Sequence, residues 1–132
     1  MKNRNEVKEL KQVINFSYSP YSNFKVGALI KTKSNRTFTG VNIENASYGL
    51  TICAERVALF KALSEGERDF KTLLVYTPTK NFTYPCGACL QVLREHCREL
   101  KIILLNKDGK KKFLRLSQLL PKPFLGSRRV KT

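Results

Sequence analysis

The chain has 132 residues, 42% of them hydrophobic, and a formal net charge of +15. This length supports one domain with a core and excludes two ordinary domains, so we expect a single domain over residues 1–132. No segment reaches the roughly 20 apolar residues of a membrane helix, and the amino terminus lacks the apolar region of a secretory signal. We therefore expect a cytoplasmic protein that does not contact membranes and whose cysteines stay reduced.

The first part of the chain predicts a helix followed by a hairpin. Apolar residues at the helical period and then in alternation predict a helix over 5–17 and two strands over 24–32 and 37–44. In the second strand Asn42 and Glu44 are two positions apart, so they share a face. Polar side chains on that face meet either water or a ligand.

The rest of the chain predicts helices and strands in alternation. Good helix formers over 53–66 predict a mostly buried helix, Phe60 included, that stops at Gly66. The later elements are expected as a strand over 70–77, a helix after Pro85, strands over 101–106 and 112–116, and a short helix over 117–121. This order predicts an α/β fold, a three-layer α/β/α sandwich around a mixed five-stranded sheet.

The positive charge is concentrated near the carboxyl end. Residues 101–132 contain ten Lys or Arg and one acid, Asp108, and residues 126–132 form a basic tail. Clustered Lys and Arg bind phosphate, so non-specific nucleic-acid binding is one interpretation. A solvated basic surface is the other, and we favour it.

Three cysteines stand at the starts of two predicted helices. Cys53 opens the second helix, and Cys86 and Cys89 open the third. Helix N-termini favour thiolate over thiol, and the sulfurs can converge if both helices start at one edge of the sheet. Three protein ligands leave a fourth tetrahedral position open, which is typical of a catalytic zinc. If Cys86 and Cys89 do not bind a metal, this reduced CxxC pair could instead be a redox centre or two small buried residues.

A fourth protein ligand is not expected. His96 and Cys97 lie about two turns into the third helix, roughly 10 Å or more along its axis from Cys89. We expect Cys97 to be a small core residue and His96 to lie at the surface.

Two residues follow Cys53 closely. Arg56 lies one helical turn further along the same face and can donate hydrogen bonds to the sulfurs. The spacing of Glu55 does not place it on the metal-facing side, and an exposed glutamate is the default for a helix.

The segment CAERVAL, followed after 25 residues by PCGAC, resembles the signature of the zinc-dependent nucleoside and nucleic-acid deaminases. The segments PYSNFKVGA, GVNIENASYGLTICAER and PCGACLQVLRE are similar to those of the short, homotetrameric cytidine deaminases, over about residues 5–125. The resemblance implies deamination of cytidine and deoxycytidine in pyrimidine salvage. It also implies one Zn²⁺ per chain on Cys53, Cys86 and Cys89, with Glu55 as the proton shuttle.

The same resemblance implies the substrate contacts. Phe24 would pack against the pyrimidine, and Asn42 and Glu44 would hold the ribose 3′-hydroxyl. The N–H of Ala54 would contact the base edge. Three further residues would reach into the active site of a neighbouring subunit in a homotetramer and make that site composite: Ala46, Tyr48 and Phe124.

One position departs from the family pattern. Many relatives have arginine directly after the second CxxC cysteine, where this chain has Leu90, so compensation of the zinc-site charge depends more heavily on Arg56. The alternatives to a nucleoside deaminase are a deaminase of RNA or DNA, a deaminase of a cytosine-containing antibiotic, and a non-catalytic zinc-stabilised binding module. The charge favours the first of these, whereas the Asn42 and Glu44 pair argues against the first two.

Overall fold

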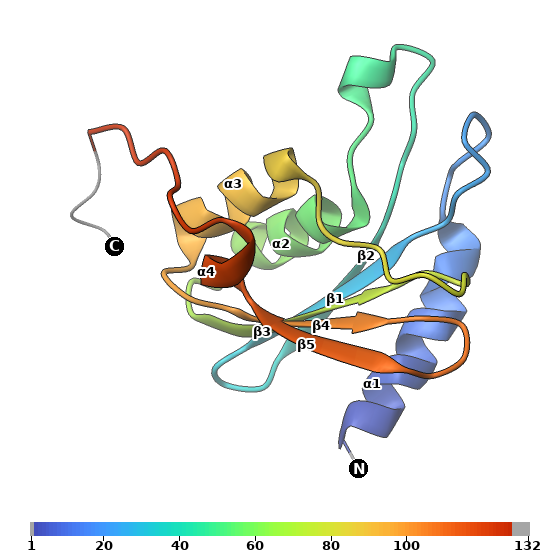
Figure 1. Ribbon diagram of the computed structural model, residues 1–132, viewed down its shortest axis with the longest axis horizontal. Coiled ribbons are helices and arrows are strands. Elements are labelled where there is room, and N and C mark those ends of the chain that lie inside the picture. Colours follow the sequence, from blue (N-terminus) through green and yellow to red (C-terminus); the bar gives the residue numbers. More distant parts are fainter. Residues whose placement is uncertain (1, 128–132) are drawn as a thin grey trace.

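A mixed five-stranded sheet forms the middle layer of the protein (Figure 1). The computed structural model describes residues 2–127, with side chains from residue 5 onward. The strand order is β2-β1-β3-β4-β5, in which β3 and β4 are parallel and the other neighbours antiparallel. The elements are α1 (Lys2–Val13), η1 (Ile14–Phe16), β1 (Gly27–Thr32), β2 (Thr37–Val41), η2 (Tyr48–Leu50), α2 (Ala54–Ser64), β3 (Phe70–Tyr76), α3 (Gly87–His96), β4 (Lys101–Leu105), β5 (Lys111–Arg115) and α4 (Leu116–Leu119).

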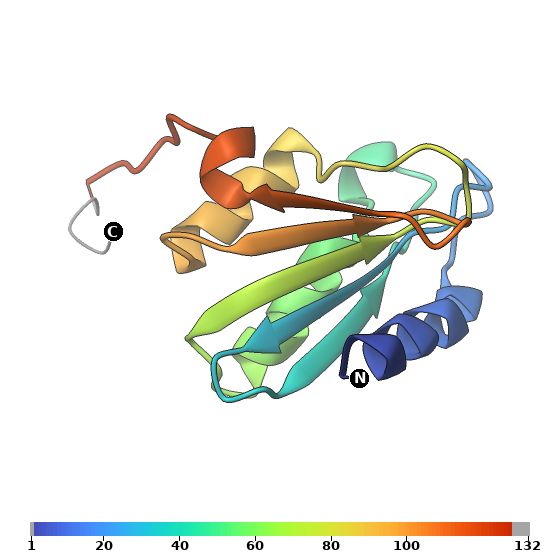
Figure 2. The same ribbon diagram turned by 60° about the horizontal axis from the view of Figure 1, so that its bottom comes forward.

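Helices cover both faces of the sheet (Figure 2). On one face, Leu10 of α1 and Ile14 of η1 join a cluster with Leu29 of β1. On the other face, α2 packs against β1, and residues of α2 and α3 share one core cluster with Ala28 and Ile30. Successive strand residues point to opposite faces, so β1 is buried along its whole length. The predicted three-layer α/β/α sandwich is confirmed.

The parallel pair β3 and β4 fixes the position of α3. Parallel neighbours need a crossover connection, and α3 makes this one. The crossover brings α3 into contact with α2 on the same face of the sheet. The two helices therefore start close together, as the cysteine pattern requires.

Several predicted boundaries were wrong. The first helix runs over Lys2–Val13 and continues as the 3₁₀ turn η1, and β1 begins only at Gly27, which leaves Phe24 in a loop. The predicted strand over 37–44 ends at Val41, because the chain then pairs with Tyr18 instead of β1. The Tyr18 N–H donates to the Asn42 carbonyl at 3.0 Å, and the Tyr18 carbonyl accepts from the Glu44 N–H at 2.8 Å.

The second helix differs from its prediction on one side. Phe60 is 43% exposed, although the sequence placed it in a mostly buried helix. The inner side of α2 is formed by other residues, among them Ala58 and Leu59, both fully buried. Gly66 has a φ of +93° just after the helix, which confirms the predicted stop.

Two expectations concern membranes and the carboxyl end. Within the described part of the chain, no helix is both long enough and apolar enough to span a bilayer. Of the basic tail expected over 126–132, residues 128–132 lie outside the described residues.

Gly40 allows α2 to lie directly on β2. A Cβ at this position would stand 2.4 Å from the Ala58 nitrogen and 2.6 Å from the Ala54 carbonyl oxygen. We expect Gly40→Ala to lower the free energy of unfolding by about 1–3 kcal/mol or more, because the backbone of α2 must move to admit a methyl group. Chemical denaturation measures this loss.

Gly49→Ala is the matched control, since no atom lies within 4 Å of a Cβ built at Gly49. Its unfolding midpoint should stay close to that of the unmodified chain. Equal midpoints for the two variants would contradict the close approach of α2 and β2 at Gly40.

Candidate metal centre

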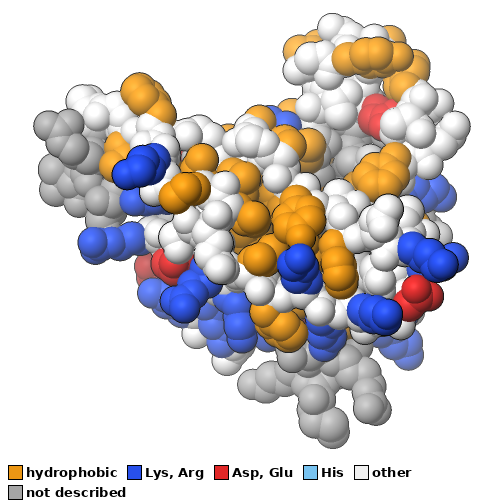
Figure 3. All heavy atoms as spheres, viewed as in Figure 1, with side chains coloured by type: hydrophobic (Ala, Val, Ile, Leu, Met, Phe, Trp, Pro, Cys, Tyr) orange, Lys and Arg blue, Asp and Glu red, His pale blue; other side chains and the backbone are white. Residues whose placement is uncertain are grey.

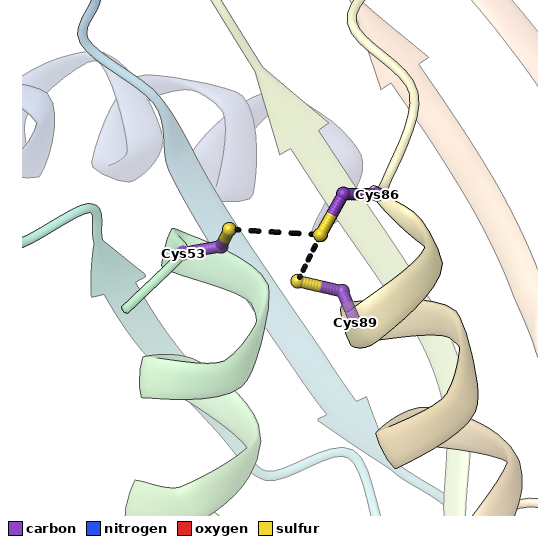
Figure 4. A group of neighbouring side chains, drawn as sticks. All are labelled: Cys53, Cys86 and Cys89. Atoms are coloured by element: carbon purple, nitrogen blue, oxygen red, sulfur yellow. Dashed lines mark hydrogen bonds between the residues drawn. The ribbon is translucent and has the colours of Figure 1, made fainter. Parts of the chain in front are cut away.

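Three cysteine side chains converge where α2 and α3 begin (Figure 4). Cys53 and Cys86 occupy the N-cap positions of α2 and α3, and Cys89 lies in the first turn of α3. The Sγ atoms of Cys53 and Cys86 are 3.8 Å apart, and those of Cys86 and Cys89 are 3.6 Å apart. The predicted convergence of the three sulfurs is confirmed.

The sulfur geometry fits zinc. Tetrahedral zinc with Zn–S bonds of about 2.3 Å places its sulfur ligands about 3.8 Å apart. All three sulfurs lie within 4.8 Å of one another, and among the described residues no other group of three or more His, Cys, Asp or Glu side chains could hold a metal. Cys89 is fully buried and Cys86 is exposed, so the cluster is accessible from one side. An accessible site with three ligands is typical of catalytic zinc.

The other candidate ligands stay outside the cluster. Cys97 is 5% exposed and packs in the core shared with α2 and α3, and burial raises the pKa of its thiol to about 12. It is therefore the small core residue that the sequence predicted. His96 is the last residue of α3 and is not part of the cluster. All four cysteines are free of disulfides.

The cluster favours a thiolate at Cys53. A hydrogen bond from the Cys89 thiol, together with Arg56, lowers the pKa of Cys53 to about 5 despite the partial burial of the residue. The pKa of Cys89 is raised, because its thiol donates to Cys53 and is buried. Zinc binds thiolates, so a cluster that already favours one is suited to the metal.

Arg56 provides positive charge next to the sulfurs. Its Nη2 atom donates to Cys53 Sγ at 3.6 Å, and its buried Nε has no hydrogen-bond partner among the described residues. Leu90 is 8% exposed and belongs to the core between the helices and the sheet, so it contributes no charge. These contacts support the predicted role of Arg56 in offsetting the charge of the cluster.

Glu55 is buried beside the cluster, contrary to the default expectation of an exposed glutamate. It is the second residue of α2 and only 3% exposed. Burial raises the pKa of its carboxyl group to about 7, and the negative charge of Cys53 adds to this effect. A carboxyl group with a pKa near neutrality can both accept and release protons at physiological pH.

Glu44 holds the loop that precedes β1. Its carboxylate accepts the N–H groups of Tyr21 at 3.0 Å and Ser22 at 3.1 Å, and it also accepts the Ser22 hydroxyl. The hydroxyl bond from Ser22 keeps the pKa of Glu44 below its usual range. The carboxylate therefore stays ionised and keeps the loop in place.

Asn42 binds the same loop a few residues further along. Its Oδ1 accepts from the Val26 N–H at 3.0 Å and from the Ser17 hydroxyl at 2.5 Å, and its Nδ2 donates to the Phe24 carbonyl at 2.7 Å. Asn42 is 8% exposed and Phe24 is 39% exposed. Asn42 and Glu44 therefore hold one segment of chain, although the strand from which the sequence predicted a shared face ends at Val41.

Ser22 was missed by the sequence analysis. Its hydroxyl donates to Glu44 and accepts the Phe24 N–H at 3.0 Å, so it connects the carboxylate to the aromatic residue. A serine that binds the backbone two residues ahead is a common turn motif, and its place after Pro20 was the available signal.

The residues expected to reach a neighbouring subunit are on the surface. Ala46 is exposed, Tyr48 is 73% exposed and Phe124 is 78% exposed. The first two lie on the loop around η2, which projects from the body of the protein, and Phe124 lies in the extended segment after α4 (Figure 1). Gln91, also missed, fixes this segment to α3, since its side chain donates to the Phe124 carbonyl at 2.6 Å.

The sequence of this chain is similar to those of known zinc-binding deaminases. The profile of the cytidine and deoxycytidylate deaminase zinc-binding region matches residues 2–105. A cytidine deaminase from Halalkalibacterium halodurans is 49% identical over 119 residues, which cover 89% of this chain and 90% of that protein. One from Mycoplasma genitalium is 38% identical over 120 residues, covering 89% and 92%.

A solved structure gives the same result for the fold. The crystal structure of cytidine deaminase from Burkholderia pseudomallei superposes with a TM-score of 0.88 at 42% identity, covering 94% of this chain and all of that one. The family match includes both helix starts that carry the three cysteines. The chain belongs to the cytidine and deoxycytidylate deaminase family.

Proposed function

We propose that this protein is a hydrolase that deaminates cytidine and deoxycytidine to uridine and deoxyuridine in pyrimidine salvage. The observation that carries the proposal is the position of buried Glu55 beside the three converging cysteines. A binding module stabilised by zinc would need the cysteines and would have no use for a buried carboxyl group of raised pKa. Relatives that cover most of this chain and are named cytidine deaminases support the same assignment.

The three cysteines and Glu55 would have different roles in the reaction. Zinc held by Cys53, Cys86 and Cys89 would supply the Lewis acid that makes water a nucleophile at neutral pH. Glu55 would carry the first proton of the attacking water to N3 of the cytosine, and would then carry the second, from the hydroxyl added at C4, to the departing amine. Its pKa of about 7 suits both directions of transfer.

The loop before β1 and the start of α2 would position the nucleoside. Phe24 would pack on the pyrimidine, and the N–H of Ala54 lies in the first turn of α2, where backbone donors have no partner within the helix. Asn42 and Glu44 would bind the ribose 3′-hydroxyl while holding the loop that carries Phe24. The same two side chains would thus shape the site and contact the sugar.

We further propose a homotetramer with composite active sites. An apolar groove next to the projecting η2 segment is lined by Ile43, Leu50, Ile52, Val57 and Phe60. Ile43, Leu50 and Phe60 are 43–64% exposed, so a second copy would bury apolar surface here. Such packing would bring Ala46, Tyr48 and Phe124 toward a neighbouring site. The four free cysteines suit a reducing compartment such as the cytoplasm.

The substrate boundary tests the nucleoside assignment. We expect cytidine and deoxycytidine to be deaminated, with kcat/KM at least about 100-fold lower for 3′-CMP, because its phosphate would meet the Glu44 carboxylate. An internal cytosine in a short single strand should not react. Ammonia release from each compound measures this.

Glu44→Gln is the matched variant, since it removes the charge and keeps an oxygen that can accept the loop N–H groups. It should reduce the discrimination between cytidine and 3′-CMP. Turnover of the oligonucleotide at a rate comparable to cytidine would overturn the assignment and favour a nucleic-acid deaminase.

A further inference from the structure

The edge strand β5 carries positive charge that the proposed deaminase chemistry does not use. Arg115 lies directly opposite Lys101 in the antiparallel pair of β4 and β5. Like charges directly opposite each other destabilise a strand pair. Lys111, Phe113 and Arg115 alternate along β5 and so share one face. This arrangement is unfavourable for the isolated protein and favourable if an anion lies between the side chains.

A hollow of about 620 Å³ lies at this end of the sheet, and Lys71, Lys101 and Arg115 are among the residues that line it. Glu99 is the acid in its wall, but its carboxylate already accepts the N–H and the hydroxyl of Ser117, at 3.0 and 2.7 Å. The Glu99 carboxylate also attracts Arg115, but one acid against three cations leaves the hollow with a net positive charge. In the view of Figure 3, Lys and Arg lie along the lower part of the molecule, with hydrophobic side chains and fewer Asp or Glu side chains among them.

Each side of β5 pairs a lysine with an exposed aromatic ring. Lys101 Nζ lies 5.8 Å from the centre of the Phe113 ring, and Lys112 Nζ lies 5.7 Å from that of Tyr84. Phe113 is 58% exposed and Tyr84 is 44% exposed. Lysines alone would protect the strand edge from aggregation, but exposed aromatic rings work against that purpose. Cations that follow a backbone beside rings that accept bases are typical of single-strand binding.

We propose that this basic edge, formed by Lys71, Lys101, Lys111, Phe113 and Arg115, binds the phosphate backbone of single-stranded nucleic acid. Phe113 stacks on a base, and the cations of the hollow bind the neighbouring phosphates. The interaction is independent of sequence and separate from the cysteine centre. It departs from the solvated surface that the sequence alone favoured, because the structure adds the opposed cations and the exposed rings.

Binding of a fluorescent twelve-nucleotide oligouridylate tests the proposal, since this strand has no cytosine. Its association constant should fall with salt, with a log–log slope of about −0.7 for each phosphate contact. Lys101→Gln combined with Arg115→Gln should remove about one to two phosphate contacts, which makes the slope shallower by about 0.7–1.4. Lys8→Gln combined with Lys11→Gln removes the same charge from exposed positions on α1 and should leave the slope unchanged.

Phe113→Ala separates stacking from charge. It should weaken binding by about tenfold while the salt slope stays the same. Zinc content and cytidine turnover of each variant show that the fold is intact. Equal effects of the two double variants, no binding of the oligonucleotide, or binding of vesicles rich in anionic lipid in place of the oligonucleotide would each overturn the proposal.

Discussion

Glu55→Gln should lower the turnover of cytidine by at least about 10²–10⁴-fold, the range typical of a general acid–base residue. Glutamine keeps the shape of the buried side chain but cannot accept a proton from water or carry one to the base. The metal should remain bound, because the cluster is built from the three cysteines without Glu55. Steady-state kinetics and elemental analysis on the same preparation measure both quantities.

Glu65→Gln is the matched control for this variant. Glu65 directly follows α2, and its side chain is 49% exposed in an ion pair with Arg36. Losing this charge should leave turnover nearly unchanged. A Glu55→Gln protein that turns over cytidine at close to the unmodified rate would exclude Glu55 as the proton shuttle.

Cys86→Ser should abolish tight zinc binding, from about one zinc per chain to well below that. A serine hydroxyl stays protonated at neutral pH and is a poor substitute for a thiolate ligand. Cys86 is exposed, so the replacement removes little from the core. A change in zinc content can therefore be attributed to the lost ligand and not to unfolding. Elemental analysis after dialysis against a weak chelator provides the measurement, and deamination should be lost together with the metal.

Cys97→Ser is the corresponding control. Cys97 is buried in the core and lies outside the sulfur cluster, so this variant should lose some stability and keep its zinc. Loss of zinc from Cys97→Ser with retention in Cys86→Ser would contradict the assignment of the ligands.

The sequence predicted the metal centre well because its geometry depends on local features. A cysteine at a helix start has a defined position, and the alternation of strands and helices places α2 and α3 on one face of the sheet. Convergence of Cys53, Cys86 and Cys89 follows from those two facts. Cys97 was identified as a core residue for the same reason, from its position along α3.

The surroundings of the centre depend on long-range packing, which local patterns do not contain. Glu55 is buried in the first turn of α2, and α2 lies directly on β2 at Gly40, a contact between segments far apart in the chain. The strand over 37–44 ends early because the backbone at Asn42 and Glu44 pairs with Tyr18, in the loop before β1. Phe60 has the pattern of a core residue and borders an exposed groove instead.

The conversion of cytidine by the purified, zinc-loaded protein tests the central claim most directly. Uridine and ammonia, measured in the same reaction, should appear in equal amounts, and both should disappear when Cys86→Ser removes the metal. Zinc-loaded protein with one metal per chain that leaves cytidine and deoxycytidine unchanged at neutral pH would contradict the account.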